Sequence, residues 1–149
     1  MIKILFVCHG NICRSPMAEF IMKDLVKKAN RDKEFLIESA ATSREELGNP
    51  VYPPVRKLLN EHGVDCSQKH AREISKQDYE QYDYLIGMDE YNLHNMQRIC
   101  GEDVSHKMHL LLDYTDHKGD VADPWYSGDF DKTWKEVSEG CKGLLATIK

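Results

Sequence analysis

The sequence lacks the features that would place it in a membrane or on a nucleic acid. No apolar run approaches the roughly 20 residues that span a bilayer. The N-terminal stretch is too short and too soon interrupted for a signal peptide. The net charge of −5 argues against a nucleic-acid binder. We therefore expect one domain over residues 1–149, with neither membrane nor nucleic-acid partners.

Cysteine is present, but not in a pattern that forms a disulfide scaffold or a metal site. The five cysteines are an odd number scattered along the chain, which is typical of a reducing compartment. No C-x-x-C pair occurs, so structural zinc is not expected. We expect a cytoplasmic protein without a metal, and the compact acidic chain favours a monomer.

Repeats, low-complexity tracts and linkers rich in Pro, Gly or Ser are also absent. Four short apolar runs, residues 3–8, 35–40, 84–88 and 108–112, have the length and composition of strands buried on both faces. Helical patterns occupy residues 17–25, 55–63, 93–99 and 130–148. Strands that alternate with helices predict an α/β fold, with a parallel sheet and helices on both faces.

Residues suited to binding an anion are concentrated where the first strand ends. Parallel sheets bind ligands beyond the carboxyl ends of their strands, and here "CHGNICRS" leads directly into a helix. The N–H groups and dipole of a helix N-terminus attract an anion. We expect Gly10 and Asn11 to take left-handed backbone angles that turn N–H groups inward. Arg14 can hold two phosphate oxygens.

The same loop suits a nucleophile. A helix N-terminus and a neighbouring arginine favour the thiolate form of Cys8. Ser15 can cap the helix or bond that thiolate, and Pro16 fits the first helical turn. A cysteine that ends a buried strand is more often an inert core residue. The residues that follow at fixed spacing favour a phosphate-binding nucleophile instead, while a Walker loop and a NAD fingerprint are absent.

The chain resembles the low-molecular-weight protein tyrosine phosphatases over nearly its whole length. "VCHGNICRSPMAE" matches the signature loop, "ESAATS" and "AREISKQDYEQYDYLIGMD" are similar to two central segments, and "DPWY" is similar to the acid loop. The resemblance implies a single-domain, four-stranded parallel sheet with flanking helices. It also implies hydrolysis of phosphotyrosine and aryl phosphates through a cysteinyl phosphate, with no cofactor. Tyrosine-phosphorylated proteins would be substrates, and inorganic phosphate and vanadate inhibitors.

The resemblance implies catalytic roles for three residues: Cys8 as the nucleophile, Arg14 as the phosphate clamp and Asp123 as the acid. The chemistry asks for such an acid independently, since a tyrosyl oxygen leaves more easily when protonated and the next step needs a base for water. On its own, Asp123 would be interpreted as part of an ordinary Asp-Pro turn. The adjacent Trp125 and Tyr126 can flank a substrate ring.

The resemblance also implies supporting and binding residues. Ser15 would bond the thiolate, and Asn11, helped by Ser39, would hold the strained backbone of the loop. The residues that we expect to contact substrate are His9, Gly10, Asn11, Ile12, Cys13, Ser15, Trp125 and Tyr126.

Three positions depart from the family pattern. Glu45, in "SREEL", stands where many members carry an aromatic pocket residue. Acidic side chains there either form a solvated face or disfavour acidic peptides. Lys69 replaces a usual histidine, and the neighbouring His70 either rejoins the network around Asn11 or lies on the surface. His9 occupies an often apolar position, where it either adds charge near the phosphate or faces solvent.

Alternatives remain for Cys13 and for the substrate. Cys13 is either a packing residue or the partner that traps oxidised Cys8 as a disulfide. Protein arginine phosphatases are similar to this family and carry a threonine at the position of Ile12, where its hydroxyl can bond the nitrogens of a phosphoguanidinium. The apolar side chain of Ile12 instead suits a phenyl ring and favours phosphotyrosine. An arsenate reductase would need cysteines in the central segment, and residues 67–99 contain none. A purely phosphate-binding module would need neither a nucleophile nor an acid.

Overall fold

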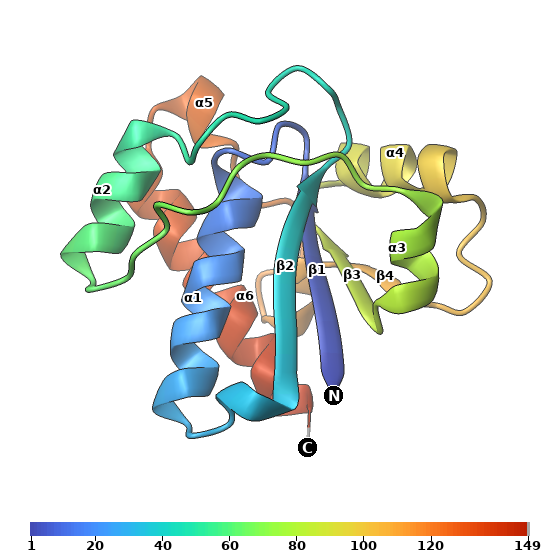
Figure 1. Ribbon diagram of the computed structural model, residues 1–149, viewed down its shortest axis with the longest axis horizontal. Coiled ribbons are helices and arrows are strands. Elements are labelled where there is room, and N and C mark those ends of the chain that lie inside the picture. The colour runs from blue at the N-terminus through green and yellow to red at the C-terminus, as the bar shows by residue number, and fades with distance from the viewer. Residues whose placement is uncertain (149) are drawn as a thin grey trace.

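One four-stranded parallel sheet organises the protein. The computed structural model describes residues 1–148, with the strand order β2-β1-β3-β4 (Figure 1). Every neighbouring pair is parallel, which confirms the predicted fold class. The strands are β1 (Ile2–Cys8), β2 (Phe35–Ala41), β3 (Tyr84–Gly87) and β4 (Met108–Leu110).

The last two strands end earlier than the apolar runs predict. Met88 leaves β3 because its N–H bonds the side chain of Asn92 at 2.9 Å, which begins a turn into the next helix. Leu111 leaves β4 to open a short 3-10 helix, η2 (Leu111–Tyr114), which packs on the C-terminal helix. Both residues stay buried, so their apolar character reports burial rather than strand geometry.

The two faces of the sheet pack against different helices. Ile4 and Phe6 of β1 point into a large core with α1 (Arg14–Lys28), α2 (Pro53–Glu61) and α6 (Phe130–Thr147). Leu5 and Val7 point the other way, since side chains alternate along a strand. They pack near α3 (Lys76–Gln81) and α4 (Glu90–Cys100). The prediction of helices on both faces is therefore confirmed.

Besides η2, three more short elements were not predicted from the sequence. The helix α3 has six residues and starts at a capping box between Ser75 and Asp78. The helix α5 (Pro124–Ser127) is a single turn capped by Asp123. A 3-10 turn, η1 (Asp32–Glu34), leads into β2. Each is too short to show a hydrophobic period.

Two glycines let α6 approach η2 closely. A Cβ on Gly143 would lie 2.0 Å from the carbonyl oxygen of Tyr114, and one on Gly140 would lie 2.4 Å from Cγ of Leu111. A side chain at either place would separate the two elements. This contact fixes the start of the segment 115–123, which returns to the carboxyl edge of the sheet.

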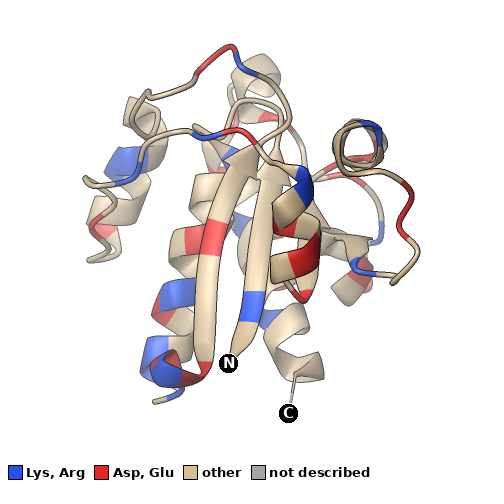
Figure 2. Ribbon diagram, turned by 45° about the vertical axis from the view of Figure 1, so that its right-hand side comes forward, with Lys and Arg blue, Asp and Glu red and all other residues tan. Residues whose placement is uncertain are grey.

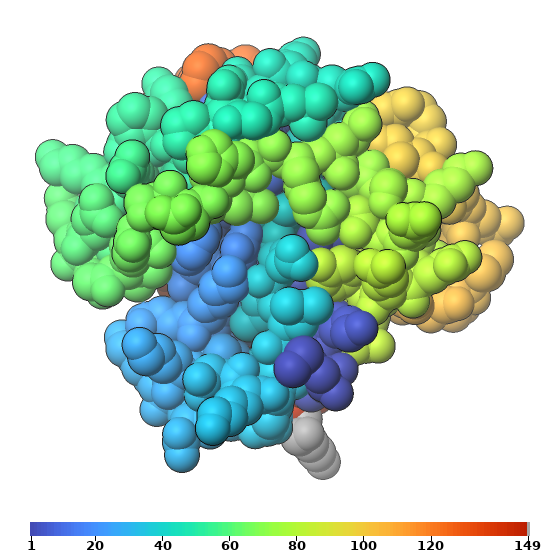
Figure 3. Space-filling model, viewed as in Figure 1, coloured from blue at the N-terminus to red at the C-terminus, as the bar shows by residue number. Residues whose placement is uncertain are grey.

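The segment between α2 and α3 lies across α1 and β2 (Figures 1 and 3). It is joined to the end of β2 by two backbone hydrogen bonds, from Ala41 N–H to the Arg72 carbonyl at 2.7 Å and from Ile74 N–H to the Ala41 carbonyl at 2.8 Å. Lys69 and Arg72 therefore lie beside the loop after β1. Within residues 1–148, no helix is long and apolar enough to cross a membrane.

Candidate active site

The loop between β1 and α1 turns through one left-handed residue. Asn11 has φ 60°, whereas Gly10 does not have a positive φ. The expectation that both residues take left-handed angles is wrong for Gly10. Asn11 alone makes the turn, while Gly10 lies under Glu46, whose Cγ would be 3.4 Å from a Cβ at that position.

Hydrogen bonds hold the unusual backbone of Asn11. Its buried side-chain NH₂ donates to Oγ of Ser15 at 2.8 Å and to Oγ of Ser39 at 2.9 Å. The side-chain oxygen of Asn11, Oδ1, accepts the backbone N–H of Arg72 at 3.2 Å. The side chain thus links the loop to β2 and to the segment that crosses it. These bonds offset the cost of a left-handed non-glycine residue.

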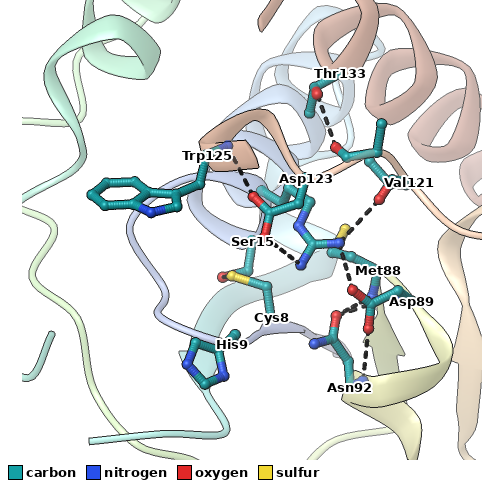
Figure 4. A network of polar contacts seen from close by, with 12 residues as sticks. Cys8, His9, Ser15, Met88, Asp89, Asn92, Val121, Asp123, Trp125 and Thr133 are labelled. Atoms are coloured by element: carbon teal, nitrogen blue, oxygen red, sulfur yellow. Dashed lines mark hydrogen bonds and ion pairs between the residues drawn. The ribbon is translucent and has the colours of Figure 1, made fainter. Parts of the chain in front are cut away.

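Two polar groups contact the sulfur of Cys8, and Figure 4 shows one of them, the side chain of Ser15. Oγ of Ser15 lies 2.9 Å from Sγ, and the N–H of Asn11 donates to Sγ at 3.3 Å. Ser15 makes no cap for α1, because that helix starts at Arg14 without a side-chain cap. Since Oγ already accepts from Asn11, its own hydrogen is free to point at the sulfur. Both groups can therefore donate a hydrogen bond to the sulfur.

Arg14 is buried, and its guanidinium group is held by two carboxylates and a backbone carbonyl. Nη1 donates to Oδ2 of Asp89 at 2.8 Å and to the carbonyl of Val121 at 3.0 Å, and Nη2 lies 3.4 Å from Oδ2 of Asp123. Burial alone would lower the pKa of the guanidinium. The negative charges of Cys8, Asp89 and Asp123 raise it, so the pKa lies above its usual value and Arg14 stays charged.

Asp89 is a site residue that the sequence analysis missed. It caps α4, with Oδ1 accepting the N–H of Asn92 at 2.8 Å, and its other oxygen binds Arg14. The sequence did contain one indication of this role. The pattern Asp-x-x-Asn begins one residue after β3, and the carboxyl end of β3 lies beside that of β1. A carboxylate at that edge is a natural partner for a buried arginine.

Asp123 stands at the start of α5 with its carboxyl group 28% exposed. Oδ1 accepts the N–H of Trp125 at 3.0 Å. Two bonds hold the preceding residues: Val121 N–H donates to the Met88 carbonyl at 2.8 Å, and Thr133 Oγ to the Ala122 carbonyl at 2.9 Å (Figure 4). The sheet and α6 together therefore bring this carboxyl group to the loop after β1.

These residues surround one cavity of about 400 Å³. The Trp125 ring forms part of one wall and packs on Tyr52, with ring centroids 5.0 Å apart. Tyr126 is 86% exposed at the rim. The sequence analysis did not name Tyr52 as part of this wall, because Tyr52 precedes α2 and lies far from the acid loop in sequence. The lining comprises Cys8, His9, Gly10, Ile12, Cys13, Arg14, Glu45, Glu46, Asp123, Trp125 and Tyr126.

His9 and Glu45 also line the cavity. Nε2 of His9 lies 3.0 Å from Oε2 of Glu45, and both side chains are more than half exposed. His9 therefore faces solvent at the edge of the cavity that it lines, and a charge on it near the phosphate stays a prediction. The backbone N–H of Ser43 donates to the His9 carbonyl at 3.0 Å, which holds the loop after β2 in this place.

Lys69, and not His70, joins the network behind the loop. Lys69 Nζ donates to the Ser39 carbonyl at 2.8 Å and lies 3.6 Å from Oε1 of Glu19. Ser39 Oγ donates to the same carboxylate. Burial lowers the pKa of Lys69, although the charge of Glu19 opposes this. His70 is exposed, and its Nδ1 lies 3.1 Å from the Gln68 carbonyl.

Cys13 lies in the loop as a buried free thiol. Burial, followed by the negative charge of Cys8, raises its pKa to about 12. All five cysteines are free. In the part of the chain that the structure describes, no cluster of His, Cys, Asp and Glu could hold a metal ion.

A cysteine and an arginine joined by an anion-binding loop, with a carboxyl group beside them, are typical of cysteine-dependent phosphatases. Comparison with known proteins gives the same class. The family model of low molecular weight phosphotyrosine protein phosphatases matches residues 3–149. The chain belongs to this family and is a cysteine-based protein tyrosine phosphatase.

Curated relatives and solved structures cover nearly the whole chain. It is 37% identical to the low molecular weight protein-tyrosine-phosphatase YfkJ of Bacillus subtilis, over 100% of this chain and 97% of the relative. The YfkJ crystal structure superposes with a TM-score of 0.95 over 99% of this chain and 94% of that one. A Streptococcus pyogenes phosphatase, SP-PTP, is 37% identical, with a TM-score of 0.90 over 100% and 94%. The drosophila arginine phosphatase DARP is 33% identical, with a TM-score of 0.89 over 99% and 98%.

Proposed function

We propose that residues 1–149 act as a single domain that removes phosphate from tyrosine-phosphorylated proteins through a cysteinyl phosphate on Cys8. One observation carries the proposal. The sulfur of Cys8 receives an N–H from its own loop and the hydroxyl of Ser15, in a cavity that also holds Arg14 and Asp123. A nucleophile, a phosphate clamp and an acid thus share one space.

In the first step the Cys8 thiolate attacks phosphorus from the floor of the cavity. The bond from phosphorus to the tyrosyl oxygen breaks, and protonated Asp123 gives its proton to that oxygen. Arg14 and the loop N–H groups stabilise the negative charge on the three equatorial oxygens. Phosphate is then attached to sulfur, and tyrosine leaves with its hydroxyl restored.

In the second step Asp123, now a carboxylate, takes a proton from water. The resulting nucleophile attacks phosphorus, the phosphorus–sulfur bond breaks, and the Cys8 thiolate and inorganic phosphate are formed. Phosphate is therefore a product inhibitor, and vanadate should inhibit by occupying the same cradle. All the charge stabilisation comes from side chains and N–H groups of the chain, so neither step calls for a cofactor.

Phosphate binding would also release the acid. Asp89 and Val121 already use Nη1 of Arg14, so Nε and Nη2 remain as donors for a bound phosphate. Two phosphate oxygens on these nitrogens would replace the longer contact of Nη2 with Asp123, at 3.4 Å. The carboxyl group of Asp123 is then free to turn to the leaving oxygen.

We further propose that the protein works in the cytoplasm as a monomer. All five cysteines are free, including the nucleophile, and a reducing compartment keeps them so.

Hydrolysis of p-nitrophenyl phosphate in the presence of a chelator tests the proposal. We expect turnover with the chelator present, and loss of turnover on adding vanadate. Cys8→Ser should abolish turnover but still bind phosphate, because the loop N–H groups and Arg14 remain. A Cys8→Ser protein with a tenth of the wild-type rate, or a wild type that requires a divalent metal, would contradict the proposal.

A further inference from the structure

A second cavity lies beside the catalytic one and shares two lining residues with it. This groove has a volume of about 710 Å³ and runs along α2. Ile12 and Glu46 line both spaces, so the groove adjoins the cavity that receives the phosphorylated side chain. Its other lining residues are Asn49, Pro50, Val51, Tyr52, Pro53, Arg56, Lys57, Asn60 and Glu61.

The floor of the groove is apolar and fixed in place. Val51 is buried, and the N–H of Tyr52 donates to the Ile12 carbonyl at 2.9 Å, which ties the floor to the catalytic loop. Tyr52 also packs against Trp125 and Phe130. A peptide that places its phosphotyrosine on Cys8 can therefore lay its neighbouring residues on a preformed surface.

Charged residues of both signs line the groove, and Figure 2 shows basic residues on α2. Glu46, at the catalytic end, accepts a hydrogen bond from Asn49. Arg56 and Lys57 are exposed on α2, and within residues 1–148 neither makes an ion pair. Glu61 lies beyond them at the end of the helix. Arg56 and Lys57 can therefore form ion pairs with acidic side chains of a polypeptide bound in the groove.

We propose that this groove binds the substrate polypeptide on one side of its phosphotyrosine, with an apolar residue over Val51 and Tyr52 and an acidic side chain on Arg56 and Lys57. This inference rests on the proposed function, since it assigns a further binding surface to the same site. The occupant is a phosphotyrosine peptide that carries a carboxylate at a defined distance from the phosphate. The position of the groove beside the catalytic cavity and the positive charge on α2 both support it.

A set of phosphotyrosine peptides with one glutamate moved along an otherwise neutral sequence tests the proposal. At one position we expect glutamate to raise kcat/KM about three- to fivefold, the size expected for partly exposed ion pairs. The Arg56→Gln, Lys57→Gln double variant should lose that preference mainly through KM. Its turnover of p-nitrophenyl phosphate, which has no flanking residues, should stay at the wild-type rate.

The matched control is the Lys76→Gln, Arg98→Gln double variant. It changes the net charge by the same amount on α3 and α4, on the other face of the sheet, and should keep the preference. Indifference of the wild type to the position of glutamate, or equal losses in both double variants, would overturn the inference. A change in mass by sedimentation in the α2 variant alone would assign the groove to a second copy, and would also overturn it. Absence of any p-nitrophenyl phosphate turnover by wild type would instead remove the proposed function itself.

Discussion

At the scale of single residues, the position of Asp123 predicts how activity depends on the leaving group. Replacing Asp123 by Asn removes the proton donor but keeps the shape. We expect kcat to fall by about 10²–10⁴ for aryl phosphates with poor leaving groups. The loss should be much smaller for those whose phenolate leaves unaided. A plot of kcat against leaving-group pKa for both proteins measures this, and parallel lines would mean that Asp123 acts only in structure.

Cys13 predicts a pH-dependent redox response. Peroxide converts the Cys8 thiolate to a sulfenic acid, and the Cys13 thiolate then displaces hydroxide to form a disulfide. Burial and the charge of Cys8 raise the pKa of Cys13 to about 12, so little thiolate exists at neutral pH. Oxidation of Cys8 removes one of these causes, but burial remains.

We therefore expect the fraction of peroxide-inactivated enzyme that a thiol restores to increase from pH 6 to pH 9. Peptide mapping should find Cys8 joined to Cys13 in the restorable form. Cys13→Ser should be inactivated irreversibly at every pH. If mapping of the wild type finds Cys8 as sulfinic acid with Cys13 free throughout, the pair does not form.

Ile12 predicts the choice between phosphotyrosine and phosphoarginine. Its side chain is 9% exposed and lines both cavities, so the floor beside the phosphate is apolar. An apolar floor suits a phenyl ring, whereas a hydroxyl would bond the nitrogens of a phosphoguanidinium. We expect kcat/KM to favour phosphotyrosine, and Ile12→Thr to shift the ratio towards phosphoarginine. A wild-type preference for phosphoarginine would contradict the assignment.

At the scale of elements, α6 approaches η2 so closely that one added methyl group at Gly143 should lower the unfolding free energy considerably. Gly143→Ala would place a Cβ 2.0 Å from the backbone oxygen of Tyr114, which cannot rotate away. We expect a loss of about 3 kcal/mol in unfolding free energy, at the upper end for overpacking. Gly140→Ala should cost less, because it meets the side chain of Leu111.

Urea unfolding of both variants measures these losses. Lys135→Ala, at an exposed position of the same helix, should change the midpoint little and serves as the control. Equal midpoints for Gly143→Ala and wild type would show that α6 and η2 separate without cost.

At the scale of the whole molecule, buried cysteine thiols and tyrosine hydroxyls predict a loss of folding stability at alkaline pH. Burial raises the pKa of six groups: Cys13, Cys66, Tyr82, Cys100, Tyr114 and Cys141. Unfolded thiols and phenols titrate near pH 8.5 and 10, so the unfolded chain releases these protons first. Stability is then full below about pH 8.5 and falls as the pH rises towards the folded values.

The midpoint of urea unfolding should therefore be nearly constant from pH 7 to 8 and decrease steadily to pH 11. Lys69, whose pKa burial lowers, acts in the opposite direction but is a single group. Tyr114, with its pKa raised to about 12, is the group to remove. Tyr114→Phe should make the decrease above pH 10 shallower, and an unchanged slope would exclude its contribution.

The sequence by itself determined where the four strands and the main helices lie, though not where β3 and β4 end, and it determined the loop from Cys8 to Arg14. These features are local, because periodicity, a strand end and a fixed loop spacing are all contained in short stretches of chain. The family resemblance supplied the expected roles of Asp123 and Ser39. Sequence reasoning was wrong on Gly10, since either a glycine or an asparagine can make a left-handed turn and the loop needs only one.

Only the tertiary structure decided how the site is held and what surrounds it. Asp89 and Val121 bind Arg14 from 75 and 107 residues away. Lys69 reaches Ser39 across 30 residues, and the groove along α2 adjoins the catalytic cavity at Ile12. Such partners meet because parallel strands bring their carboxyl ends to one edge of the sheet, and that edge is made by packing rather than by any local sequence pattern.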